Sequence, residues 1–198
     1  MRDEVQPNVR AFPLSPRTGR GRPPLRVEEL SMSLLDGFEG GPADTVVLPI
    51  WSDERPLTGL AALIDWRTCA WLSRALREGV TTGARGEATL TMTRRLGAAW
   101  RVVMIGMGER GGLDREDARE LGDGIFDVLA RLGARKVLLG VPSGRRDPSL
   151  PLSLCEAIAG RLQDAAAGAR DPRDAPIWWA VAEPELVPYL RALAEGRP

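Results

Sequence analysis

The sequence predicts an α/β fold in which helices cover both faces of a mixed, mainly parallel β-sheet, giving a three-layer α/β/α sandwich. Several segments, among them DTVVLPIW (44–51), RVVMIGMG (101–108) and KVLLGVP (136–142), are apolar without alternation, as strands buried on both faces are. Amphipathic segments with helical spacing lie between them, and strands that alternate with helices favour a parallel sheet. The 198 residues are 43% hydrophobic, which suits one domain with a core of ordinary size.

The N-terminal half begins with strands and a broken helix. Alternating apolar residues predict a first strand within 25–37, at Val27, Leu30, Met32 and Leu34. The segment 44–51 is a second strand. Residues 60–76 predict a helix with a break near Trp66, because apolar side chains recur there at three-, four- and seven-residue spacings. Residues 86–93 and 101–108 predict two strands joined by a short turn through 96–98.

The C-terminal half alternates helices and strands. A helix is predicted from an N-cap at Asp114, with acidic residues in its first turn, to a stop at Gly133. Strands at 136–142 and 176–182 and helices at 152–168 and 183–196 complete the chain. Trp178 and Trp179 are neighbours in a strand, so their rings should face opposite sides of the sheet. The other tryptophans are expected to pack rather than stack on ligands: Trp51, Trp66, Trp71 and Trp100.

Composition separates a basic arm from the domain. Residues 1–26 hold six arginines and two acidic residues among prolines and glycines, although the whole chain has a formal net charge of zero. We therefore expect a disordered basic arm at 1–24 and a single domain at 25–198. There is no apolar run of membrane-spanning length, no signal-peptide core and no CxxC pair, so we expect a cytoplasmic protein without a membrane or nucleic-acid partner. Cys69 and Cys155 are predicted to be small core residues.

The sequence also excludes several catalytic devices. The chain has no histidine, which rules out Ser-His-Asp and Cys-His catalysis within it. Its carboxylates gather at helix starts and on exposed faces, without the spacing of metal ligands. The single lysine, Lys136, opens a strand, where a surface position is expected. We therefore predict no catalytic residue, no metal site and no cofactor.

The glycines in RVVMIGMGERGGLDRED (101–117) have the G-x-G-x-x-G spacing of a dinucleotide site at Gly106, Gly108 and Gly111. In such a site the glycines form the turn into the helix, so that the pyrophosphate sits on the helix N-terminus. Here the helix starts later, at Asp114, and its acidic first turn repels phosphate. The position for a ribose-binding acid falls near Arg131, inside the helix. The pattern is therefore better explained by tight backbone geometry.

A weaker candidate site remains at the carboxyl ends of the strands, where ligands collect in open α/β sheets. The glycine loop and PSGRRD (142–147) could share one crevice there, with backbone amides and guanidinium groups for an anionic, nucleotide-like ligand. Its residues would be Gly106, Gly108, Gly111, Ser143, Gly144, Arg145 and Arg146.

The order of motifs between 44 and 142 resembles the N-terminal domain of the leucine aminopeptidase (cytosol aminopeptidase) family. The motifs are DTVVLPIW, LAALIDWRTCAWLSRAL, REGVTTGARGEATLTM, RVVMIGMGER, LDREDARELGDGIFDVLARLG and KVLLGVP. The resemblance implies a macro-domain-like sandwich. In that family, hydrolysis belongs to a separate C-terminal domain with two metal ions around an NTDAEGR motif, and these residues contain no such motif.

Three functions follow from this resemblance and from the crevice. The first is a non-catalytic domain that associates with itself, as a homo-oligomer, or with a peptidase, because the family's N-terminal domain sits on the catalytic core and helps to shape a hexamer. The second is a small-molecule or nucleotide-binding module. The third, a metal-dependent aminopeptidase, is opposed by the missing metal ligands.

Overall fold

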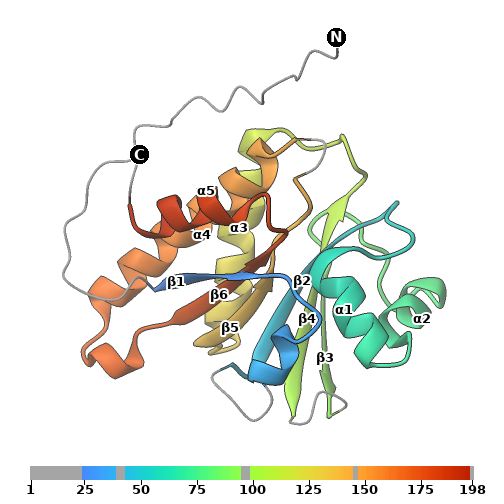
Figure 1. Cartoon of the computed structure of the whole chain (residues 1–198), viewed down its shortest axis with the longest axis horizontal. Helices are drawn as coiled ribbons and strands as arrows, with labels where there is room; N and C mark the ends of the chain where they lie inside the picture. Colours follow the sequence, from blue (N-terminus) through green and yellow to red (C-terminus); the bar gives the residue numbers. More distant parts are fainter. Residues whose placement is uncertain (1–23, 39–42, 95–98, 145–146, 197–198) are drawn as a thin grey trace.

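The computed structural model describes residues 24–38, 43–94, 99–144 and 147–196, which form a three-layer α/β/α sandwich (Figure 1). The six-stranded sheet has the order β1-β6-β5-β2-β4-β3. Neighbouring strands from β1 to β4 run parallel, whereas β3 pairs antiparallel with β4 at one edge. The predicted fold class is confirmed. The predicted arm at 1–24 lies, except for its last residue, outside the described residues.

The sheet and helices have the following bounds. The strands are β1 (Leu25–Glu29), β2 (Thr45–Trp51), β3 (Ala88–Thr93), β4 (Trp100–Gly108), β5 (Lys136–Gly140) and β6 (Ile177–Ala182). The helices are α1 (Gly59–Arg67), α2 (Trp71–Arg77), α3 (Arg115–Arg131), α4 (Ser149–Gly168) and α5 (Val187–Ala194). Two 3-10 helices, η1 (Leu34–Phe38) and η2 (Pro172–Asp174), lie in the connections.

The first strand is shorter than predicted, so its predicted extent was wrong. The observed strand β1 ends at Glu29, which pairs with the last residue of β6, Ala182. Leu30 still donates its N–H to the carbonyl of Ala182 (2.8 Å), but beyond this point β6 offers no partner, so Leu34 enters η1 instead. The other strands agree with their predicted ranges to within two residues at each end. The turn predicted at 96–98 lies outside the described residues.

The predicted break in the helix at 60–76 is confirmed, and it falls at 68–70. Cys69 and Ala70 adopt positive φ angles of 56° and 58°, which end α1 and redirect the chain into α2. The carboxylate of Asp65 accepts hydrogen bonds from the backbone N–H (3.0 Å) and hydroxyl (2.6 Å) of Ser73. A side chain of the first helix therefore satisfies an otherwise unpaired N–H at the start of the second.

The predicted helix at 115–132 is found as α3, and its start is capped as expected. The carboxylate of Asp114 accepts from the N–H of Asp117 (2.9 Å), and the carboxylate of Asp117 accepts from the N–H of Asp114 (3.1 Å). This reciprocal capping box satisfies donors that a helix start leaves free. Helix α4 begins earlier than predicted, at Ser149, and α5 begins later, at Val187, after a turn closed by the Leu186 N–H and the Glu183 carbonyl (3.0 Å).

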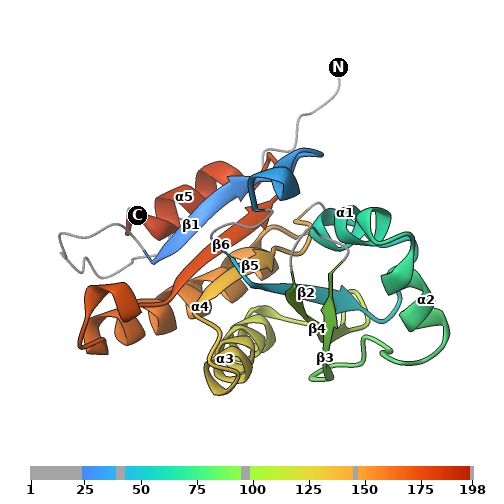
Figure 2. The ribbon, with the colours of Figure 1, turned by 90° about the horizontal axis from the view of Figure 1, so that it is seen from below.

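Two apolar cores lie on the two faces of the sheet. Helices α3, α4 and α5 pack on one face together with Trp178, whereas α1, α2 and η1 pack on the other together with Trp179. Figure 2 shows α1 and α2 on the opposite side of the sheet from α3 and α4. Both tryptophans are buried, which confirms that neighbouring rings in β6 face opposite sides.

The packing predictions hold for some side chains and fail for others. Trp51 and Trp100 are buried, whereas Trp66 is 63% exposed on α1. Cys155 is fully buried in α4, and burial raises the pKa of its thiol to about 12. Cys69 is exposed because it lies in the connection from α1 to α2, so its assignment to the core was wrong. Among the described residues, no helix combines the length and apolar character needed to cross a membrane.

Candidate functional site

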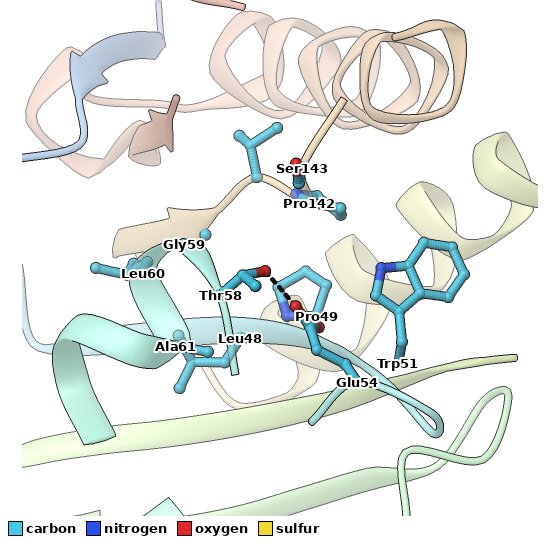
Figure 3. A pocket seen from close by; sticks show the side chains of 12 residues that line it. Leu48, Pro49, Trp51, Glu54, Thr58, Gly59, Leu60, Ala61, Pro142 and Ser143 are labelled. Carbon is cyan, nitrogen blue, oxygen red and sulfur yellow. Dashed lines mark hydrogen bonds between the residues drawn. The ribbon is translucent and has the colours of Figure 1, made fainter. Parts of the chain in front are cut away.

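Strands β2 and β5 are neighbours whose following connections lead in opposite directions across the sheet. After β2 the chain passes through α1, α2 and β3 to β4, and after β5 it passes through α4 to β6 on the other side. The carboxyl ends of two such strands form the position where open α/β sheets bind ligands. A pocket lies there, lined by side chains that include Trp51, Glu54, Thr58, Pro142 and Ser143 (Figure 3).

This pocket is small because protein groups fill it. Its cavity volume of about 20 Å³ holds roughly one water molecule. Gly140 also lines the pocket, and a Cβ added to it would lie 3.2 Å from the Cβ of Leu60. The end of β5 and the first turn of α1 therefore meet closely, and this contact keeps the pocket narrow.

A buried carboxylate lies on the wall of the pocket. Glu54 is only 5% exposed and accepts a hydrogen bond from the Thr58 hydroxyl, drawn as a dashed line in Figure 3. The Arg110 guanidinium lies 2.6 Å from the same oxygen, and the backbone N–H of Arg110 donates to Asp53 (3.0 Å). The glycine loop after β4 is thereby tied to the loop after β2. An anion entering this pocket would find the nearby guanidinium of Arg110 already paired with Glu54.

The glycine pattern is explained by a loop that lies across the end of β4. The N–H of Gly106 donates to the Glu87 carbonyl (2.7 Å), and that of Gly108 donates to the Gly83 carbonyl (2.9 Å). A Cβ on Gly106 would stand 1.9 Å from the Ala84 carbonyl oxygen, so only glycine fits. Gly108 and Gly111 have φ angles of 79° and 87°, which side chains disfavour. The amides of Gly106 and Gly108 are thus used within the protein.

The crossing loop, residues 81–87, is organised by Glu87. Its carboxylate accepts from the N–H and hydroxyl of Thr82 (both 2.8 Å) and from the N–H of Gly83 (2.9 Å). Desolvation alone would raise the pKa of Glu87, but these hydrogen bonds outweigh it and lower the pKa. Sequence reasoning did not single out Glu87 as a loop organiser, although the Gly-Glu pair before a strand belongs to the family resemblance.

Arg85 joins the same loop to the start of α3. Its guanidinium forms an ion pair with Asp117 and lies 3.8 Å from Glu120. The pKa of Asp117 is lowered by the hydrogen bond from the Asp114 backbone and then by that from Arg85. The acidic helix start therefore has an internal cation as its partner, which the sequence did not predict.

The other loop of the predicted crevice, residues 142–147, follows β5. In the sheet β2 lies between β5 and β4, so the 52–58 loop after β2 separates residues 142–144 of this loop from the glycine loop after β4. The hydroxyl of Ser143 donates to Glu183 (3.0 Å). A Cβ on Gly144 would stand 2.8 Å from a methyl group of Leu186. Arg145 and Arg146 lie outside the described residues. The structure thus brings Ser143 together with the pocket, and the shared anion crevice stays a prediction.

The acidic side chains of the described part of the chain are dispersed. Within it, no group of three or more His, Cys, Asp or Glu side chains could hold a metal ion. The buried carboxylate of Glu54 has Thr58 and Arg110 as its partners rather than further carboxylates.

Comparison with known families identifies the domain. The sequence model of the cytosol aminopeptidase family, N-terminal domain, matches residues 47–167. The chain belongs to this family. The match includes the loops after β2, β4 and β5, and the resemblance inferred from the order of motifs is confirmed. A search of the curated proteins finds no match.

Solved structures agree with this domain at the level of the fold. A mutant of tomato leucine aminopeptidase superposes with a TM-score of 0.56 at 11% identity over 89% of this chain. The chain spans only 36% of that enzyme's length. A mutant macrodomain from Oceanobacillus iheyensis superposes with a TM-score of 0.54 at 12% identity, over 76% of this chain and 82% of its own. The described part of this chain therefore has a macrodomain-like fold.

Proposed function

We propose that this domain is non-catalytic and acts in the cytoplasm through protein–protein association, with further copies of itself or with a peptidase. The observation that carries the proposal is the filled pocket at the carboxyl ends of β2 and β5. The place where this fold would admit a ligand holds about one water molecule and a paired, buried carboxylate. The amides of Gly106 and Gly108 are likewise engaged inside the domain.

Side chains exposed elsewhere support a surface role. Several large apolar side chains are left in solvent on different elements: Met32, Trp66, Val80, Leu90, Met92 and Tyr189. Three of them, Val80, Leu90 and Met92, lie on or beside β3, and apolar surface gathered in this way is stabilised when another protein covers it. Membership in a family whose matched domain is the N-terminal one is consistent with a role in assembly rather than in chemistry.

The mass of the purified chain tests the proposal. Light scattering after gel filtration measures the mass of the peak that contains this chain. For the protein alone we expect a mass above the 21.5 kDa of one chain. Alternatively, after mixing with a full-length cytosol aminopeptidase, we expect the chain to elute with the peptidase at a mass above that of the peptidase alone. The same peptidase without the chain is the control. A mass of one chain under both conditions contradicts association. Sustained hydrolysis of leucine p-nitroanilide by the rigorously purified chain with manganese or zinc contradicts the non-catalytic part.

Binding of an anionic nucleotide is a second candidate, favoured by the position of Ser143 and Pro142 beside the pocket at the end of β5. We expect ADP-ribose to leave the melting temperature unchanged, because the pocket holds only about one water molecule and the Arg110 guanidinium beside it is already paired with Glu54. A bound ligand would raise the melting temperature through mass action. A saturable rise that is lost in the Arg145→Ala/Arg146→Ala variant would establish the nucleotide site instead.

A further inference from the structure

The strand β3 is an edge of the sheet without the features that usually protect an edge. Within the described part of the chain it hydrogen-bonds to β4 and to no second strand (Figure 2). Natural edge strands are protected by charged side chains, proline or bulges, because their free N–H and C=O groups pair readily with another strand. The six residues of β3, ATLTMT, include no charge and no proline. The opposite edge, β1, carries Arg26, Glu28 and Glu29.

The side chains of β3 form two different rows. Ala88 and Leu90 pair with Ile105 and Val103, so this row and Met92 lie on the α3 side of the sheet. Leu90 is 49% exposed and Met92 is 68% exposed. Thr89 and Thr91 form the other row, on the α2 side. One row is thus apolar and the other is made of hydroxyl side chains, and neither repels a copy of itself.

Neither neighbouring helix covers this edge. A groove of about 320 Å³ separates β3 from α3, and another of about 260 Å³ separates β3 from α2. Val80, which is 59% exposed, lines the second groove beside Thr89 and Thr91. The exposed side chains of β3 are therefore accessible from both faces of the sheet.

The charges at the two ends of β3 favour pairing with the same strand of another molecule. Glu87 precedes the strand and Arg94, which is exposed, follows it. In an antiparallel pair of identical strands, the start of each lies beside the end of the other. The acidic end of one copy then lies at the same end of the pair as the basic end of its partner. The attraction acts between the strand ends as a whole rather than as a direct cross-strand ion pair, because the Glu87 carboxylate also bonds to Thr82 and Gly83 in its own loop.

Symmetry gives the same result for the rows. A two-fold axis perpendicular to the sheet keeps side chains on their own face, so the apolar row meets the apolar row and the threonines meet threonines. Such cross-strand pairs stabilise antiparallel sheets. A two-fold interface of this type closes after two copies and leaves no further edge of β3.

We infer that two copies of this chain associate through β3, which pairs antiparallel with the β3 of the partner and joins the two sheets into one. This inference rests on the proposed function and names its partner and surface. The partner is a second copy rather than an unrelated strand, because the edge is uncharged, self-complementary in its rows and opposite in charge at its ends.

The test uses the full chain and two matched double variants. Leu90→Lys/Met92→Lys places positive charges on β3, where each copy meets those of the other. Met32→Lys/Tyr189→Lys adds the same charge at side chains that are 64% and 41% exposed, on elements other than β3. We expect light scattering to give twice the 21.5 kDa chain mass for wild type and control, and 21.5 kDa for the β3 variant.

Hydrogen exchange on the wild type gives an independent readout that does not depend on variants folding. We expect the amides of 88–93 to exchange more slowly as the protein concentration rises. If the two double variants have equal masses and the amides of 88–93 show no slower exchange at higher concentration, the β3 interface is wrong. Association through another surface, as in the proposed function, is not contradicted by that result. A wild type that is monomeric alone but heavier with an aminopeptidase overturns the second copy as partner. A monomer under all conditions overturns both this inference and the proposed function.

Discussion

Replacing Gly106 by alanine is expected to lower the free energy of unfolding by roughly 4 kcal/mol, the sum of overpacking and of hydrogen bonds lost between β4 and its crossing loop. The new Cβ would stand 1.9 Å from the Ala84 carbonyl oxygen, which is backbone and cannot rotate away. Either the end of β4 or the 81–87 loop must move. That movement disturbs the bonds from Gly106 to Glu87 (2.7 Å) and from Gly86 to Gly106 (3.0 Å).

Gly111→Ala is the matched control within the same glycine pattern. Gly111 has a φ of 87°, but nothing lies within 4 Å of its Cβ position. We expect a smaller loss of about 1–2 kcal/mol from backbone strain alone. Urea denaturation followed by circular dichroism measures both. If Gly106→Ala lowers the free energy of unfolding no more than Gly111→Ala does, the packing explanation is wrong. Ligand binding would then be the better explanation of the glycine pattern.

This comparison also shows what the sequence could predict at the site. The spacing of the glycines and the N-cap at Asp114 already argued against a dinucleotide loop. The cause of the spacing was not accessible, because it depends on residues 81–87 crossing β4 from another part of the chain. The pairing of Glu54 with Arg110 likewise joins residues far apart in sequence. Such contacts depend on the order of strands in the sheet, and this order cannot be predicted from the hydropathy pattern.

The fold was more predictable because its signals are local. Unbroken apolar runs identified β2, β4, β5 and β6, and an N-cap at Asp114 with an acidic first turn identified α3. Errors arose where tertiary context decides. The first strand ends where β6 ends, at Ala182, and Trp66 is exposed although it was expected to pack. The free edge at β3 also became visible only once β3 was known to pair with β4 alone.

The contact between α3 and α4 provides the second large expected effect. Helix α3 contains Gly122 and Gly124, two positions apart, and only the first faces α4 closely. A Cβ on Gly122 would stand 2.6 Å from the Leu154 carbonyl oxygen and 3.0 Å from the Ala157 Cβ. After this contact along α3, Arg161 lies 3.2 Å from Asp123 and also pairs with Asp127. Before it, Arg119 lies 3.4 Å from Glu156, so ion pairs join the helices on both sides of the glycine.

We expect Gly122→Ala to lower the free energy of unfolding by about 1–3 kcal/mol, because the added methyl group forces α3 and α4 apart. Gly124→Ala is the control, since nothing lies within 4 Å of its Cβ position and the helix interior is otherwise unchanged. Alanine there should raise the free energy of unfolding by roughly 0.5–1 kcal/mol through helix propensity. Both glycines share that gain, so the difference between the variants in urea denaturation measures the packing of the two helices. Equal stability of the two variants would show that α3 and α4 do not meet at Gly122.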